Sequence, residues 1–204
     1  MGKLRAEGYD IPGITEDDAI ANIKRLLRPY YRSRDDAELR KLLADGLADR
    51  VPVDEYKAFV ATFPADVQRQ IADGREKPED AYLVLKDGAR ADFVVPRWKI
   101  GDLMVLPQPL RGARRSEEAD ILHDKKRPLH HAYRAVYYDL VHKEKVDAIV
   151  HLGTHGTQEF SLGKQRAPSV WDDTQTTIGN VPVVYPYAVH DPGEAIIARR
   201  HGVA

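Results

Sequence analysis

The fold class of this 204-residue chain is decided by residues 128–153, PLHHAYRAVYYDLVHKEKVDAIVHLG. Apolar residues recur at helical spacing from Ala132 to Val141, and this pattern predicts a helix over 128–145. The short apolar run at 146–150 is typical of a strand that is buried on both faces. A helix that leads directly into a buried strand is the repeating unit of a parallel sheet, so this segment predicts an α/β fold.

Further strand candidates lie on either side of this segment. Residues 81–96, AYLVLKDGARADFVVP, contain two apolar runs around an Asp-Gly pair, which indicates a hairpin. Residues 102–109 and 181–189 each contain another short apolar run. We therefore expect residues 81–204 to form an α/β core segment, with a mostly parallel sheet flanked by helices.

The first part of the chain, residues 1–80, is expected to be a helical N-terminal segment. Thr15 begins a sequence that resembles a capping box, and apolar residues at helical spacing follow it. A second helix is indicated after Asp35, and Pro52 and Pro64 each precede a further helical pattern.

Composition excludes several classes of function. The chain has no cysteine, which excludes disulfides, thiolate metal sites and a cysteine nucleophile. Its formal net charge of −1 provides no field that would attract nucleic acid or a membrane surface. No apolar run approaches the ~20 residues of a membrane helix, and the N-terminus lacks a signal-peptide pattern. We expect a cytoplasmic protein that binds neither nucleic acid nor membrane.

The candidate site lies in residues 146–165, VDAIVHLGTHGTQEFSLGKQ. Ligands of open α/β sheets bind beyond the carboxyl ends of the strands, and His151 is expected at such an end. If a helical turn begins in the glycine-bracketed loop, His155 and Glu159 share one face at i and i+4. Two imidazoles and a carboxylate suit a borderline divalent ion such as Co²⁺, Ni²⁺ or Zn²⁺, or proton abstraction near neutral pH. In the structural alternative, His151 bonds a strand-end carbonyl, and Glu159 caps a helical turn or pairs with Lys164.

A second polar cluster lies just before the helix predicted over 128–145 and in its first turn. His130 and His131 fall in its first turn, where the field of the helix favours anionic or neutral partners. Arg111 follows another strand candidate and is suited to binding a carboxylate. The alternative for these residues is an ordinary polar surface loop.

Four segments of the second half carry a family resemblance. In chain order they are QPLRG (108–112), HDKKRPLHHAYRAVY (123–137), VDAIVHLGTHGTQEFSLGK (146–164) and VYPYAVHDPGEAIIARR (184–200). Over about residues 101–201 the chain resembles the large subunit of cobaltochelatase and magnesium chelatase. Leu129 and Leu162 depart from the family pattern, which has proline at both positions. Those subunits are several times longer, so the resemblance implies that this chain is a fragment of one.

The resemblance implies ATP-dependent insertion of a divalent metal into a tetrapyrrole. The expected reaction is insertion of Co²⁺ into a corrin precursor, a step of cobalamin biosynthesis. One alternative is insertion of Mg²⁺ into protoporphyrin by a magnesium chelatase, and another is a non-catalytic tetrapyrrole- or metal-binding module. The implied partners are an AAA+ ATPase subunit and an integrin-I-like subunit, which use the ATP. The chain itself contains no G-x4-G-K-[ST] phosphate loop.

Within that reaction, one group of residues is expected to deliver the metal and accept the pyrrole protons, as metal ligands and catalytic residues: His151, His155 and Glu159. A second group is expected to bind the substrate through its peripheral carboxylates or to take part in proton removal: Arg111, His130, His131 and Lys164.

The histidine content of the site favours cobalt. Mg²⁺ prefers oxygen ligands and keeps its waters, whereas Co²⁺ accepts imidazole readily. The first group of residues also allows a stand-alone metallohydrolase with two histidines and one carboxylate. Such an enzyme would need an open coordination position and an activated water.

Overall fold

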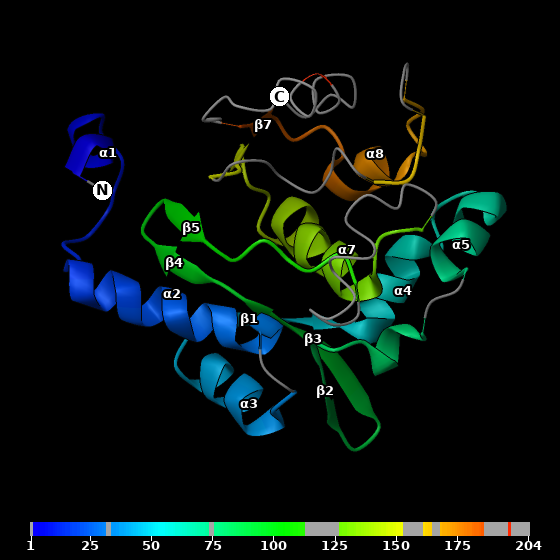
Figure 1. The fold of residues 1–204 in the computed structure, drawn as a ribbon, viewed down its shortest axis with the longest axis horizontal. Coiled ribbons are helices and arrows are strands. Elements are labelled where there is room, and N and C mark those ends of the chain that lie inside the picture. Colours follow the sequence, from blue (N-terminus) through cyan, green and yellow to red (C-terminus); the bar gives the residue numbers. More distant parts are fainter. Residues whose placement is uncertain are drawn as a thin grey trace.

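The computed structural model shows helices packed around small sheets (Figure 1). The structure describes residues 2–31, 34–73, 76–112, 127–152, 161–164, 168–185 and 196. The helices are α1 (Gly2–Ala6), α2 (Glu16–Tyr31), α3 (Asp36–Ala44), α4 (Val53–Val60), α5 (Ala65–Ala72), η1 (Pro78–Asp80), α7 (His131–Tyr138), η2 (Asp139–Lys143) and α8 (Asp173–Ile178). The strands are β1 (Ala48–Pro52), β2 (Val84–Asp87), β3 (Arg90–Pro96), β4 (Trp98–Ile100), β5 (Leu103–Val105), β6 (Ile149–Val150) and β7 (Val183–Val184). No helix in the described ranges has both the length and the apolar character that a membrane crossing requires.

The largest sheet of the described residues has three antiparallel strands in the order β1-β3-β2. In the middle strand, Phe93 lies opposite Val51 on one side and Val84 on the other. A tight turn joins β2 to β3, with Gly88 at a φ of 62°. A positive φ at the first turn position is what a type II′ hairpin requires. The hairpin predicted for residues 81–96 is therefore confirmed.

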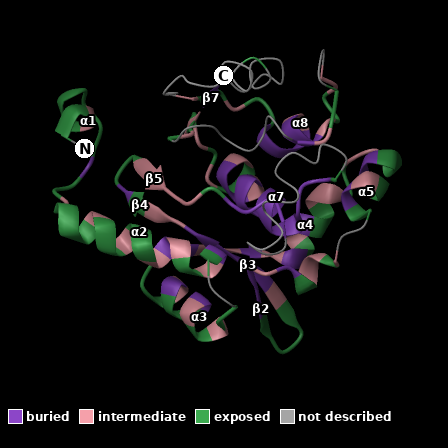
Figure 2. Cartoon of the chain, viewed as in Figure 1, coloured by how far each residue is buried: buried purple, intermediate pink, exposed green. Residues whose placement is uncertain are grey.

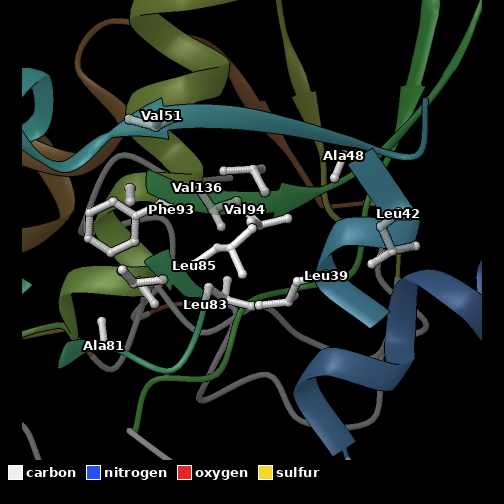
Figure 3. Close-up of a cluster of buried hydrophobic side chains, with 14 of the residues drawn as sticks. Leu39, Leu42, Ala48, Val51, Ala81, Leu83, Leu85, Phe93, Val94 and Val136 are labelled. Carbon is white, nitrogen blue, oxygen red and sulfur yellow. The ribbon is translucent and has the colours of Figure 1, made fainter. Parts of the chain in front are cut away.

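The main hydrophobic core surrounds this sheet. In Figure 1, α3 lies below the sheet and α7 above it, and Figure 3 shows Leu39 of α3 and Val136 of α7 among the buried side chains. Phe93 and Val94 of the middle strand are both 0% exposed. Because successive side chains of a strand point to opposite faces, the sheet must be covered on both faces. Each such buried side chain contributes about 1.5–3 kcal/mol to folding.

The helix predicted over 128–145 is confirmed as α7, which continues into the π-helical turn η2. All of its residues except Tyr138 are buried, and Figure 2 shows most of α7 in the colour of buried residues. Val136 belongs to the main core, whereas Tyr137 belongs to a second hydrophobic cluster with Ile178 of α8. α7 therefore lies between two packed units and positions side chains in both.

The expectation of a mostly parallel sheet is wrong. The main sheet and the β4–β5 pair are antiparallel, and β6–β7 is the one parallel pair within the described ranges. The reason is the connections, because tight turns join β2 to β3 and β4 to β5, whereas parallel neighbours need a crossover of a dozen or more residues. The strand predicted at 146–150 is also not buried on both faces, since Val150 is 61% exposed.

The division of the chain at residue 80 stays a prediction. β1 lies in the segment 1–80, yet it pairs with β3 of the segment 81–204, and the main core takes side chains from both. The sequence pattern did not indicate β1, because its residues ADRVP mix charged and apolar side chains. Its place in the sheet is fixed by the partner strand.

The predicted helix starts of the N-terminal segment are confirmed. The Thr15 hydroxyl accepts a hydrogen bond from the backbone N–H of Asp18 at 3.1 Å, at the start of α2. The Asp35 carboxylate accepts bonds from two backbone N–H groups of α3. α4 and α5 begin directly after Pro52 and Pro64. These starts depend on interactions between residues close in sequence, which is why the sequence alone located them.

The turn between β4 and β5 contains a glycine that the surrounding backbone requires. Gly101 has a φ of 57°, and a Cβ built on it would lie 1.7 Å from the carbonyl oxygen of Asp10. The same carbonyl accepts a hydrogen bond from the Asp102 N–H at 3.0 Å. Gly101→Ala is therefore expected to lower the free energy of unfolding by about 2–3 kcal/mol, measured by urea titration.

Gly88→Ala is the matched control, because Gly88 also has a positive φ, of 62°, but an added Cβ meets nothing within 4 Å. Its expected cost is about 1 kcal/mol, from backbone conformation alone. Equal losses in the two variants would contradict the close contact with Asp10.

Candidate functional site

His130 is the N-cap residue of α7. Its side chain is 0% exposed, and its Nδ1 accepts a hydrogen bond from the Ala132 N–H at 3.2 Å. Because Nδ1 accepts, the ring proton lies on Nε2, which contacts the Glu76 carboxylate. Burial raises the pKa of Glu76, but the contact with His130 outweighs burial and lowers this pKa overall. The predicted position of His130 at a helix N-terminus is thus confirmed.

His131 faces a different neighbour on α4. Its Nδ1 lies 3.0 Å from the Tyr56 hydroxyl, and the two rings meet edge to face at 5.8 Å. His131 is 5% exposed and Tyr56 is 1% exposed. The two adjacent histidines therefore hold α7 against two separate parts of the N-terminal segment.

His151 lies at the carboxyl end of β6, as the sequence predicted. Its backbone N–H donates to the Val184 carbonyl of β7 at 2.9 Å, and its ring meets the Tyr185 ring at 4.7 Å. Nε2 lies 3.1 Å from the Tyr137 hydroxyl. Burial lowers the pKa of His151 to about 4, so at neutral pH the ring is uncharged and has one nitrogen lone pair available.

The contact with Tyr137 joins His151 to residues that sequence reasoning missed. The Gln108 side-chain amide donates to the Tyr133 hydroxyl at 3.1 Å and to the Tyr137 hydroxyl at 3.2 Å. The two tyrosine rings stack at 5.0 Å along α7. Gln108 begins the QPLRG segment and Tyr137 ends the HHAYRAVY segment, so their place in those segments was the available signal. The structure brings three separate segments of the sequence together at one point.

The remaining described candidates lie in contrasting environments. Arg111 is 3% exposed, so its charged group lies inside the protein. Lys164 is exposed, and its backbone N–H donates to the Asp172 carboxylate at 3.2 Å. The assignment of Arg111, His130, His131 and Lys164 to substrate binding stays a prediction.

The other two members of the predicted metal site, His155 and Glu159, lie outside the described residues. Among the residues that are described, no three His, Cys, Asp or Glu side chains gather closely enough to hold a metal ion. The described part of the site is therefore His151 and the network behind it, and the role of the trio stays a prediction.

A buried ion pair anchors α8 to α7 beside this network. Arg134 is 4% exposed and contacts the Asp173 carboxylate, and it also donates to the Thr176 hydroxyl at 3.1 Å. The Asp173 carboxylate accepts a further bond from the Leu129 N–H at 2.8 Å. Because both charges are inside the protein, each depends on the other for its stability.

The whole chain resembles proteins of one known family. The family model described as CobN/Magnesium Chelatase matches residues 1–204. The chain belongs to this family. Its members that resemble it include the aerobic cobaltochelatase subunit CobN of Sinorhizobium sp, which is 30% identical over 201 residues. They also include the chloroplastic magnesium-chelatase subunit ChlH of Oryza sativa subsp. indica, which is 37% identical over 202 residues.

A solved structure of this family shares the fold. The catalytic subunit of cobaltochelatase from Mycobacterium tuberculosis matches with a TM-score of 0.66 and 28% identity, over 90% of this chain and 17% of that one. The alignments with the CobN and ChlH relatives each cover 98% of this chain. The chain spans 15% of the length of that CobN and 13% of that ChlH. The family resemblance seen in the sequence is confirmed.

Proposed function

We propose that the chain is part of the tetrapyrrole-binding catalytic subunit of an ATP-dependent cobaltochelatase, which inserts Co²⁺ into a corrin precursor. The observation that carries this proposal is the hydrogen-bonded contact of Gln108, Tyr137 and His151. These residues come from three of the four segments that resemble the chelatase family. A shared hydrogen-bond network joins those segments at the strand end where His151 lies.

The site must exchange a metal ion for ring N–H protons. A porphyrin loses two N–H protons and binds M²⁺ as a dianion, whereas a corrin binds it as a monoanion, so insertion releases H⁺ in either case. An uncharged imidazole can accept a proton or bind the incoming ion in place of water. We assign these roles to His151 together with His155 and Glu159, the latter two on the basis of the sequence.

Substrate binding is assigned to the cationic and imidazole side chains, because the substrate has peripheral carboxylates. Arg111 can bind a carboxylate in a bidentate manner, and Lys164 offers an exposed charge within the site segment. His130 is already bonded to Glu76, so a substrate carboxylate would have to replace that partner.

Insertion of Mg²⁺ into protoporphyrin is the second candidate function, and it is supported by the 37% identity to the rice ChlH subunit. Cobalt is favoured by the ligand set, because Co²⁺ accepts imidazole and Mg²⁺ prefers oxygen. The AAA+ and integrin-I-like partner subunits are assigned to ATP hydrolysis in both cases.

His151→Gln in the full-length protein tests the proposal. With the partner subunits, ATP, Co²⁺ and a corrin precursor, this variant is expected to lose about 100-fold in kcat for metal insertion, because a proton acceptor or ligand is removed. Tetrapyrrole binding, followed by fluorescence quenching, is expected to be retained. Repeating the assay with Mg²⁺ and protoporphyrin identifies the metal.

His142→Gln is the matched control. His142 is an exposed histidine that packs on Phe59 and Tyr138 and lies outside the four family segments. It is expected to retain the wild-type kcat. Unchanged turnover in His151→Gln would show that His151 takes no part in the chemistry. Metal insertion without ATP would contradict the role assigned to the ATP-hydrolysing partner subunits.

A further inference from the structure

The contact between Tyr137 and His151 decides which ring nitrogen can serve the site. Nε2 of His151 lies 3.1 Å from the Tyr137 hydroxyl. Nδ1 is buried and has no hydrogen-bond partner among the described residues. The ring of an uncharged histidine has one N–H and one nitrogen lone pair. If Nε2 carries the proton, Nδ1 therefore carries the lone pair, and the reverse also holds.

The side chain of Gln108 fixes the position of the Tyr137 hydroxyl. Its oxygen lies 3.3 Å from Gln108 Oε1, to which it donates, and 3.2 Å from Gln108 Nε2. Gln108 Nε2 also donates to the Tyr133 hydroxyl at 3.1 Å, which keeps the amide in place. When the Tyr137 O–H donates to Gln108, its lone pair faces His151 and accepts the Nε2 proton.

We infer that Tyr137 is a positioning residue that accepts the Nε2 proton of His151 and so presents the Nδ1 lone pair to an incoming metal ion or pyrrole proton. The inference rests on the proposed function, which gives His151 its role. Histidines that bind metals commonly donate their second ring N–H to a fixed acceptor, which sets the tautomer and the ring orientation. Tyr137, 2% exposed and anchored by Gln108, is such an acceptor.

Tyr137→Phe removes this acceptor and keeps the ring, its stacking on Tyr133 and its burial. Tyr138→Phe is the matched control, because its hydroxyl donates to Glu55 at 3.0 Å and the residue is adjacent on the same helix. Tyr138→Phe loses its hydrogen bond to Glu55, at about 1 kcal/mol, whereas Tyr137→Phe loses contacts with both Gln108 and His151 and is expected to cost more. The tautomer of His151 is therefore the deciding readout, because it reports on that ring and not on general stability.

The first measurement is the tautomer of His151 in the ¹⁵N-histidine-labelled chain, by long-range ¹H–¹⁵N NMR, with His151→Gln identifying its signals. The wild-type chain and Tyr138→Phe are expected to show the proton on Nε2, and Tyr137→Phe a mixture of both tautomers. A proton on Nδ1 in the wild-type chain, or the same tautomer in both variants, would overturn the inference.

The second measurement is metal insertion by the full-length protein with its partner subunits. Tyr137→Phe is expected to lower kcat by about 10–100-fold with the KM for tetrapyrrole unchanged, whereas Tyr138→Phe keeps the wild-type values. Equal kcat values for the two variants would overturn the inference. The NMR measurement needs no chelatase activity, so a failure of the proposed function, seen with His151→Gln, is distinguishable from a failure of the positioning role.

Discussion

Asp173→Asn is expected to lower the free energy of unfolding by about 3–5 kcal/mol, because it leaves the Arg134 charge buried without its counterion. Arg134 and Asp173 are 4% and 1% exposed, so water cannot replace the lost partner. The carboxylate also accepts the Leu129 N–H at the start of α7, so the substitution weakens the contact between α7 and α8. Urea denaturation of the chain, followed by circular dichroism, measures the loss.

The neighbouring residue provides the control for this prediction. Asp172 is only partly buried, and its carboxylate accepts bonds from the backbone N–H groups of Lys164 and Ser169. Asp172→Asn is expected to cost about 1 kcal/mol. Replacing the pair together, with Arg134→Met and Asp173→Leu, is expected to restore most of the stability, because no charge is then left buried. A similar loss in all three variants would contradict a role for charge pairing.

Asp139→Asn is expected to have the opposite effect and to stabilise the chain by about 4 kcal/mol at pH 8. Asp139 is 0% exposed, and neither carboxylate oxygen has a hydrogen-bond partner among the described residues. Burial, followed by the charge of Asp49, raises the pKa of Asp139 to about 7. Glu144 also raises this pKa, while Lys143 and Arg97 lower it.

The sign of the pH dependence follows from whether the folded or the unfolded chain binds the Asp139 proton more tightly. The folded chain keeps the Asp139 proton up to about pH 7, whereas an unfolded chain loses it near a pKa of ~3.9. The contribution of the Asp139 proton to the free energy of unfolding is therefore fully present below about pH 4 and is lost as the pH rises to about 7. Asp139→Asn should remove this dependence, so the two chains should differ at pH 8 and agree near pH 4.

Asp92→Asn is the control for Asp139, because Asp92 is an aspartate that is equally buried but paired. Its carboxylate accepts from Arg50 at 3.0 Å and from Arg90 at 2.7 Å. Loss of those bonds is expected to destabilise the chain at pH 8. Thermal unfolding at pH 4, 6 and 8 measures the stability of both variants. If Asp139→Asn were destabilised at pH 8, this would contradict the claim that the unpaired, buried Asp139 carboxylate destabilises the folded chain.

Much of the candidate site could be located from the sequence, but its partners could not. His151 at a strand end and His130 at a helix start were predicted correctly, because strand ends and helix starts follow from local patterns. Gln108 and Tyr137 were not, because an amide and a phenol in apolar segments have no spacing that indicates a shared contact. That contact spans 29 positions of the chain and exists only once α7 is packed.

The sequence by itself determined the local elements of this protein. Asp35 specifies a helix start and Gly88 a hairpin, because the interactions that fix them join residues a few positions apart. Only the tertiary structure decided that Ala48 pairs with Pro96 and that Asp139 is buried without a partner. Those outcomes depend on which parts of the chain, far apart in sequence, pack against one another and exclude water. The packing of the whole chain decides this, and no single segment does.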